Sequence, residues 1–323
     1  MGTVFIILAI VIAVVLILYL VFIVGPAVLS FDKIFGKKSD KPLEGRDISK
    51  TYFAPYEKMM REAVDRVEKN YELKRVKTTS YDGLDLYADY IDSGSDKTAA
   101  FFHGYSASPL VNFGVHTEYF LKHGYNVLLV FQRAHGVSGG EYCTLGALEW
   151  HDVLSWVDYL DSMPAKNVVL YGISMGTSTI AYASEYIKSE KVKVLVLDCG
   201  YLSPYLQIYR DCERRHLPGK LLLPIINGMF RRRFKVDLRV NTADSLKNNK
   251  IPSLFLHGKT DETVPYNDSQ VNYDACACEK KLLLPDGLHH TLSFFTGSDE
   301  MRVEIFDYIE SHFDKNATEG ENK

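Results

Sequence analysis

Short apolar runs, rich in branched and aromatic residues, recur between residues 99 and 287 and are separated by segments with helical periodicity. The runs show no polar alternation, which is typical of strands that are buried on both faces of a sheet. Helical segments such as Ala147–Met163 are long enough to return the chain for a parallel neighbour. The pattern predicts an α/β protein with a doubly wound, mostly parallel sheet. The six runs are "AAFFHG", "YNVLLVF", "NVVLYG", "VKVLVLDCG", "IPSLFLHG" and "KKLLLPDG".

Two stretches depart from this rhythm. The segment "YELKRVKTTSYDGLDLYADYI" alternates like an antiparallel hairpin with Asp82-Gly83 as its turn, and an amphipathic helix over Tyr56–Asn70 precedes it. Between Gly200 and Lys250 only helical pieces are evident. An insertion there, above the carboxyl ends of parallel strands, would lie where α/β proteins bind ligands. It is either a lid over a hydrophobic substrate or another packed crossover helix.

Residues Thr3 to Gly25, "TVFIILAIVIAVVLILYLVFIVG", contain no charged side chain. About 20 apolar residues suffice for a helix to cross a bilayer. A cleaved signal peptide fits poorly, because no basic region precedes the stretch and its apolar part exceeds the usual ~7–15 residues. A buried core helix would show a polar stripe, which is missing. We therefore expect a single transmembrane anchor over residues 3–25.

The flank after this segment carries Lys33, Lys37, Lys38 and Lys41. The positive-inside rule therefore predicts that the protein is anchored in the cell membrane with its C-terminal domain in the cytoplasm.

Five cysteines cannot all pair, which suits a reducing compartment. Cys276-x-Cys278 lacks a second pair at metal-like spacing and reads as ordinary thiols rather than a zinc site. Neither a metal nor an organic cofactor is expected.

The expected organisation is an anchor over 3–25, a juxtamembrane linker and helix over 26–70, a catalytic domain over 71–314 and a polar tail over 315–323. The possible lid insertion covers about 201–250.

The net charge of −4 gives no electrostatic argument for nucleic-acid binding. Arg231-Arg232-Arg233 is either a solvated basic face or a contact for acidic lipid or substrate head groups. The sequence does not define an oligomeric state.

Gly172-Ile173-Ser174-Met175-Gly176 fits the pattern G-x-S-x-G, directly after an expected strand and before an expected helix. A nucleophilic serine in this context sits on a strained turn that lifts its hydroxyl clear of the sheet, and the glycine flanks let neighbouring backbone approach that turn. The alternative is that Ser174 is only a small residue in a tight strand-to-helix turn. The partners of Ser174 decide between the two.

A serine hydroxyl needs a base, and the base needs an orienting acid. In folds of this type they follow the serine in the order acid, then histidine. Asp261 in "LFLHGKTDETVP" and the pair His289-His290 in "LLLPDGLHHTLSFF" each follow their own strand. Asp198, which ends an earlier strand, is a rival for the acid.

The developing negative charge of a tetrahedral intermediate requires backbone N–H groups aimed at it. Met175, where the helix opens, supplies one candidate amide. In "FFHGYSAS", His103-Gly104 follows a strand and would let the Tyr105 amide supply the other. The alternative for the second segment is a simple strand-ending turn.

Together these motifs resemble the α/β-hydrolase superfamily of serine hydrolases, and most of all the bacterial membrane-anchored members of the serine aminopeptidase and monoacylglycerol-lipase-like group. The resemblance covers about residues 70–313. It includes "QRAHGVSGGEYCTLGALEWHDVLSWVDYL", similar to a D-x-R-x-H-G-x-S-x-G segment and its helix, "HGKTDETVP", similar to H-G-x-x-D-x-x-V-P, and "GLHHTLS", similar to G-x-x-H. Phe131 departs from the pattern, since relatives usually carry Asp there, and this affects the local loop rather than the triad.

The resemblance implies Ser174 as nucleophile, Asp261 as acid and His290 as base, with Tyr105 and Met175 as oxyanion amides. His289 and Asp198 remain alternates for the last two triad positions.

Arg133 and His135 are expected to brace the loop beside the oxyanion hole. Glu149 and Asp152, spaced i and i+3, would pair with Arg133 or form a solvated face.

The predicted activity is hydrolysis of a carboxylic ester through an acyl-enzyme, with a lipid-like or acyl ester as the preferred small-molecule substrate. A thioester or peptide bond is the alternative on the same triad. A non-enzymatic, membrane-tethered binding module with this fold is the competing class. Such proteins typically lose a triad residue or an elbow glycine, and the sequence retains all of them.

Overall fold

The computed structural model describes residues 1–38 and 52–313. The chain divides into two compact units, which we call the sheet unit and the helical unit. The sheet unit comprises Lys37–Leu202 and Asn241–Lys323, and the helical unit comprises Met1–Gly36 and Ser203–Val240. Lys41 and the polar tail at 315–323, both named above, lie outside the described residues.

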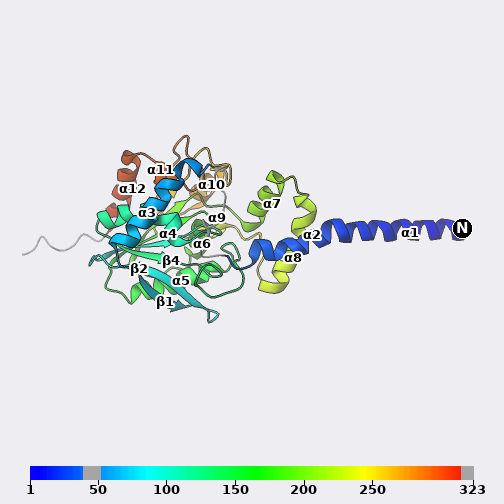
Figure 1. Cartoon of the computed structure of the whole chain (residues 1–323), viewed down its shortest axis with the longest axis horizontal. Coiled ribbons are helices and arrows are strands. Elements are labelled where there is room, and N and C mark those ends of the chain that lie inside the picture. The colour runs from blue at the N-terminus through cyan, green and yellow to red at the C-terminus, as the bar shows by residue number, and fades with distance from the viewer. Residues whose placement is uncertain (39–51, 314–323) are drawn as a thin grey trace, which may run out of the picture. The chain divides into compact units, whose positions relative to one another are not determined.

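The sheet unit is built on one eight-stranded sheet in the order β1-β2-β4-β3-β5-β6-β7-β8 (Figure 1). β2 pairs antiparallel with β1 and with β4, and all other neighbours pair parallel. This is the doubly wound, mostly parallel sheet that the sequence predicts. The strands are β1 (Lys74–Thr79), β2 (Asp85–Ile91), β3 (Lys97–Phe102), β4 (Asn126–Val130), β5 (Asn167–Ile173), β6 (Val192–Asp198), β7 (Ser253–Leu256) and β8 (Lys280–Leu283).

The predicted hairpin is formed by β1 and β2, in a register that opposes Lys74 to Tyr90 and Thr79 to Asp85. Gly83 at its turn has φ +84°, a conformation that favours glycine. The central strands β4 and β5 are buried along their whole length, which explains why their sequences are continuous apolar runs.

Helices cover both faces of this sheet, and each face has its own apolar core. Alternate residues of β3 point to opposite sides: Ala99 and Phe101 join the core that includes residues of α3, α4 and α12. Ala100 and Phe102 join the other core, with residues of α5, α6 and α9. The helices of the unit are α3 (Glu57–Asn70), α4 (Pro109–Lys122), α5 (Glu149–Asp161), α6 (Met175–Ala183), α9 (Thr242–Leu246), α10 (Asn267–Ala275), α11 (Ser293–Thr296) and α12 (Asp299–Ser311), with the 3-10 turn η2 (Ala54–Tyr56) before α3.

In the helical unit, the apolar N-terminal segment and the insertion helices are joined. One helix runs through α1 (Gly2–Tyr19), the π-helical turn η1 (Leu20–Val24) and α2 (Gly25–Phe35), and it is long and apolar enough to be a candidate membrane span. The insertion supplies α7 (Pro204–Arg214) and α8 (Gly219–Phe234), and no strand occurs between 203 and 240, all of which is described. α8 packs against α7, α2 and η1.

Aromatic side chains hold α2 to α8. The ring centroids of Phe35 and Phe230 lie 5.0 Å apart, and those of Phe31 and Phe234 lie 6.4 Å apart. Phe31, Phe35 and Phe230 are buried. Burying a phenylalanine contributes about 1.5–3 kcal/mol, so this contact is a substantial part of the unit's core. Nothing in the sequence pattern predicted that residues about 200 positions apart would share this core.

Candidate active site

Ser174 lies on a strained turn between β5 and α6. Its backbone has φ +53° and ψ −112°, which is rare for a residue with a side chain. The neighbouring glycines are required by space: a Cβ at Gly172 would lie 2.4 Å from the Thr177 nitrogen, and one at Gly176 would lie 1.8 Å from the Phe102 oxygen. The G-x-S-x-G pattern therefore reflects a close approach of backbone around the serine, as the sequence interpretation requires.

Three side chains from separate loops form a hydrogen-bonded chain with Ser174 at one end. His290 Nε2 lies 2.9 Å from Ser174 Oγ, and His290 Nδ1 lies 2.6 Å from Asp261 Oδ2. Because a carboxylate only accepts, Nδ1 carries the proton, and Nε2 is left to accept the proton of the serine hydroxyl. All three residues are buried. This geometry is that of a Ser-His-Asp triad.

The carboxylate of Asp261 is held on both oxygens. Oδ1 accepts from the backbone N–H groups of Thr263 and Val264, each at 2.8 Å. His257 Nε2 lies 2.9 Å from Oδ2 and 2.9 Å from the Val264 carbonyl, so this nitrogen must be the donor. Burial works to raise the pKa of Asp261, but its interactions with His290 and His257 outweigh burial and hold the pKa below the usual range.

His257 is a member of the site that the sequence interpretation missed. Its ring is fully buried, and its Nδ1 lies 2.7 Å from the hydroxyl of Ser269, which completes its hydrogen bonding. The available signal was the histidine of "LFLHGKTDETVP", which ends its strand four residues before Asp261. Histidine ends other strands as well, so this position did not stand out.

The two alternates of the sequence interpretation occupy different surroundings. Asp198 is fully buried at the end of β6, where Oδ2 accepts a long bond of 3.4 Å from the Tyr171 hydroxyl. Burial raises the pKa of Asp198 to about 7, the neighbouring Asp261 adds to the increase, and His257 opposes it. His289 stacks on Tyr52 with ring centroids 5.3 Å apart. The backbone carbonyl of Asp198 accepts from the Ser174 amide at 2.8 Å, but among the described residues neither alternate's side chain has a hydrogen bond to Ser174 or His290.

The loop after β3 lies against the serine. A Cβ at Gly104 would be 3.6 Å from the Ser174 Cβ. The Gly104 amide donates to Asn112 Oδ1, and the Ser106 amide donates to His135 Nε2. The Tyr105 peptide is thereby held between two fixed neighbours, while Met175 opens α6 with an N–H group of the first helical turn. These are the two amides that the sequence interpretation named for the oxyanion hole.

The loop after β4 is braced by a buried ion pair. Arg133 donates to both oxygens of Asp152, each at 2.6 Å, and also to Asp82 at 2.9 Å. Glu149 accepts instead from the Thr144 and Gly146 amides of the same loop. One of the two predicted acids thus pairs with Arg133, and the other holds the backbone.

Phe131 occupies the position where relatives usually have Asp. Its carbonyl accepts from the hydroxyl of Ser138 at 2.6 Å, and its ring lies under the Arg75 guanidinium at 4.9 Å. The loop is therefore fixed without an acid at this position.

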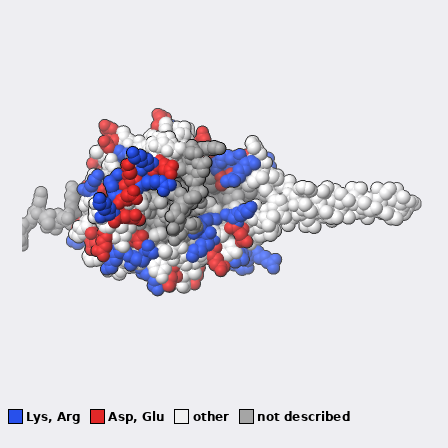
Figure 2. Space-filling model, viewed as in Figure 1, with Lys and Arg blue, Asp and Glu red and all other residues white. Residues whose placement is uncertain are grey.

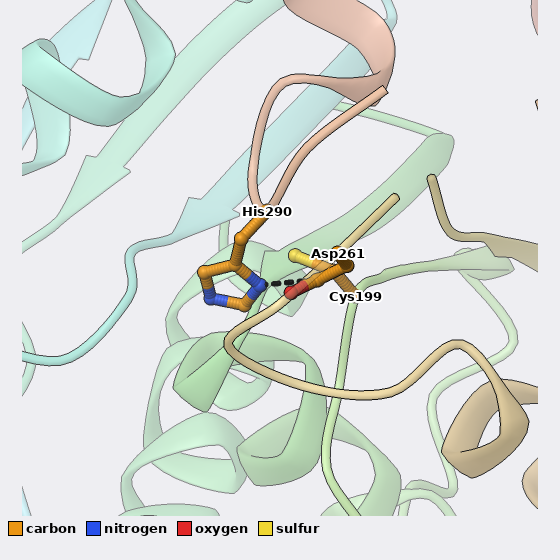
Figure 3. Close-up of side chains that lie close together, drawn as sticks. All are labelled: Cys199, Asp261 and His290. Atoms are coloured by element: carbon orange, nitrogen blue, oxygen red, sulfur yellow. Dashed lines mark hydrogen bonds and ion pairs between the residues drawn. The ribbon is translucent and has the colours of Figure 1, made fainter. Parts of the chain in front are cut away.

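Cys199 brings a thiol close to the acid and the base of the triad, as Figure 3 shows. The ligand atoms of Cys199, Asp261 and His290 all lie within 4.8 Å of one another, a spacing that would suit a metal ion. Burial raises the pKa of the Cys199 thiol well above its usual value, however, and a thiol must lose its proton to bind a metal. The Asp261 and His290 atoms are also already bonded to each other. Asp261 and His290 therefore fit the hydrogen-bonded chain with Ser174 better than a metal site with Cys199.

Comparison with known proteins supports the same fold. A family model described as the alpha/beta hydrolase fold matches residues 101–230. The esterase Pf2001 of Pyrococcus furiosus superposes with a TM-score of 0.64 at 25% identity, over 76% of this chain and 94% of that one. An esterase of Exiguobacterium antarcticum superposes with a TM-score of 0.56 at 17% identity, over 73% of this chain and 99% of that one, and this likeness concerns the fold alone.

Two bacterial relatives share part of the sequence. The chain is 26% identical over 197 residues to the uncharacterized protein YqkD of Bacillus subtilis, which covers 59% of this chain and 64% of YqkD, slightly less than two thirds of its length. It is 23% identical over 244 residues to the uncharacterized protein YfhR of Escherichia coli K12, which covers 72% and 79% of the two chains. Together with the strand order, these findings establish that the chain has the α/β-hydrolase fold and resembles hydrolases of that fold, among them esterases.

Proposed function

We propose that this protein is a membrane-anchored serine hydrolase that cleaves a carboxylic ester through an acyl-enzyme. The observation that carries the proposal is the continuous hydrogen-bonded chain from Ser174 Oγ through His290 to Asp261. A strained serine turn, a buried base of defined tautomer and a carboxylate bonded on both oxygens are costly features that a binding module would not need.

The proposed reaction begins when Ser174 Oγ attacks the ester carbonyl while His290 Nε2 takes the hydroxyl proton. The resulting oxyanion accepts hydrogen bonds from the Met175 and Tyr105 amides. As the carbon–oxygen bond to the alcohol breaks, His290 returns the proton to the leaving oxygen, and the acyl group stays on Ser174. Water, activated by His290, then attacks the acyl-enzyme and releases the carboxylic acid. Asp261 keeps its charge throughout and orients the imidazole.

A lipid-like or acyl ester is the preferred substrate in this proposal, because the candidate membrane span would hold the enzyme beside such molecules. The insertion after β6 is proposed as the lid that selects the acyl chain. Lys33, Lys37 and Lys38 follow the span and favour a cytoplasmic catalytic domain under the positive-inside rule. Thioester or peptide cleavage by the same three residues is the alternative.

An activity-based probe tests the central claim. A fluorophosphonate should label the full-length protein in detergent, and Ser174→Ala should abolish the labelling because the attacking oxygen is gone. Ser189→Ala, which changes a half-buried serine of the same sheet unit outside the triad, should label like the wild type. A folded wild-type protein that the probe does not label would favour the non-enzymatic binding module instead.

A series of p-nitrophenyl esters tests the substrate class. Turnover should rise with acyl-chain length in the full-length protein reconstituted into nanodiscs. The span and α2 must be retained, because α2 packs on the insertion helix α8. A flat or short-chain profile would contradict the lipid-like ester, and faster turnover of acyl-CoA thioesters or aminoacyl amides would move the assignment to thioesterase or peptidase.

A further inference from the structure

The helical unit differs sharply in charge from the rest of the chain. Residues 203–240 contain nine Lys or Arg and three Asp or Glu side chains, a net charge of +6, whereas the whole chain has a net charge of −4. All other residues together therefore carry −10. The segment with this excess of cations includes α8, which packs against the apolar N-terminal helix.

The cations at the end of α8 lie at the surface. Arg231, Arg232, Arg233 and Lys235 are exposed at the end of α8. Arg231 lies 3.6 Å from Asp237, but its side chain is 63% exposed, so this pair neutralises little of the local charge. For Arg231-Arg232-Arg233, the sequence left two alternatives open: a solvated basic face, or a contact for acidic head groups.

A second basic group spans the end of α7, the connection to α8 and the first turn of α8, and it is mixed with exposed apolar residues. Arg214, Arg215 and Lys220 are exposed there, and Leu217 and Leu221 are 47% and 53% exposed. Exposed leucines beside cations are typical of elements that lie in the interfacial layer of a membrane, where the apolar side chains enter and the cations meet head groups. Figure 2 shows that the protruding part of the N-terminal helix presents no charged side chain.

The packing of α8 fixes the depth at which these groups would lie. Six further uncharged residues follow the expected span Thr3–Gly25 before Asp32, and α8 contacts η1, which covers Leu20–Val24. A helix rises about 1.5 Å per residue and the hydrocarbon core is about 30 Å thick, so a span that begins near Thr3 leaves the core near η1. α8 therefore contacts the helix at the level where it leaves the core, and Phe230 and Phe234, which flank the arginine run, pack farther along it on Phe35 and Phe31.

We propose that α8 and the exposed cations of residues 214–239 form a surface that binds the anionic phospholipid head groups of the leaflet from which the N-terminal helix emerges. The proposal rests on the membrane anchoring proposed above. The contact between Phe35 and Phe230 attaches the insertion helix α8 to the anchor helix. Attraction between the cations and anionic lipids then holds α8 against the membrane surface. A cytoplasmic leaflet rich in anionic lipid is the surface of matching sign.

Hydrogen exchange of the full-length protein in nanodiscs tests this assignment. In discs with 30% phosphatidylglycerol, amides of 228–240 should exchange about tenfold more slowly than in pure phosphatidylcholine discs, and about 0.5 M NaCl should remove the difference. R231Q/R232Q/R233Q should also remove it. The matched control K69Q/K188Q/K250Q neutralises three exposed lysines of the sheet unit and should keep it, and exchange of β5 amides reports whether each variant is folded.

Equal exchange in both lipid compositions would overturn the proposal. So would equal protection by inorganic phosphate in phosphatidylcholine discs, which would make the surface a site for soluble anions. If the N-terminal helix did not anchor the protein, the protein would elute apart from discs of either composition. That result would overturn both the anchoring and the lipid-binding surface that depends on it.

Discussion

Buried aspartates lie at the end of β6 and in the loop after β7, and the pKa values of their two carboxyl groups are displaced in opposite directions. Asp261 accepts from two backbone amides, His257 and His290, and its pKa is held below the usual range despite burial. Asp198 has no hydrogen-bond partner on Oδ1 among the described residues, and burial raises its pKa to about 7. The donors around a buried carboxyl group thus decide whether its pKa lies below or above the usual range.

The strongest test of this difference is amide substitution at the two positions. Asp261→Asn should lower kcat/KM for a p-nitrophenyl ester by about 10³–10⁴, because the amide cannot hold the His290 tautomer that accepts from Ser174. Asp198→Asn should stay within about threefold of the wild type at pH 7, since it replaces an acid that does not contact the triad histidine. Circular dichroism of both variants should confirm folding. If Asp198→Asn were the more damaging change, the acid role would belong to the end of β6.

A smaller loss should follow when Asp261 keeps its charge but loses a donor. His257→Phe removes the N–H that lies 2.9 Å from Asp261 Oδ2 and leaves the carboxylate less constrained. We expect kcat to fall about ten- to a hundredfold with KM nearly unchanged, because misplacement of a reacting group affects the transition state most. Steady-state kinetics in detergent measures both constants.

Two matched variants separate positioning from simple packing. His257→Gln restores an N–H donor and should recover about tenfold of the lost kcat. His116→Phe makes the same substitution at another fully buried histidine, one whose ring nitrogens have no hydrogen-bond partner in the described structure, and it should leave kcat unchanged. Equal losses at His257 and His116, without rescue by glutamine, would show that His257 acts only through packing.

Much of the candidate site was visible in the sequence, because local chemistry determines it. The turn around Ser174, whose φ is positive, requires a glycine on each side of the serine and a strand before it. Both requirements can be recognised in consecutive residues of the sequence. Parallel strands end at one edge of a sheet, so Ser174, Asp261 and His290 could be expected to meet there. Phe131 also shows the limit of motif reading, since Ser138 and Arg133 fix the loop without the usual acid.

The parts that were not predicted depend on contacts between distant segments. The choice between Asp198 and Asp261 rests on the donors around each carboxyl group, and chain order alone names both. α2 pairs with α8 through a contact between the side chains of Phe35 and Phe230. The apolar face of each helix can be recognised from its periodicity, but that periodicity does not specify which other helix will cover it. His257 was missed for the same reason: its role exists only because Asp261 and Val264 fold back onto it.

The smallest effect, on stability, tests the neutral state of Asp198 directly. With a folded pKa of about 7 and an ordinary value of 3.8, the unfolded chain releases this proton as the pH rises through 4 while the folded chain keeps it until about 7. The free energy of unfolding of the wild type therefore falls across that window, and Asp198→Asn, which mimics the neutral acid, should not share the fall. The variant should gain up to a few kcal/mol over the wild type at pH 8 and almost nothing at pH 4.

Urea unfolding in detergent, followed by the fluorescence of the buried Trp156, measures this difference at each pH. Asp261→Asn should behave in the opposite sense. The depressed pKa of Asp261 stabilises the folded state above the ordinary pKa, so the loss caused by the amide should be largest at neutral pH and shrink in acid. A stability difference for Asp198→Asn that is the same at pH 5 and pH 8 would mean that Asp198 does not titrate between them. The two strand ends would then differ in hydrogen bonding but not in charge.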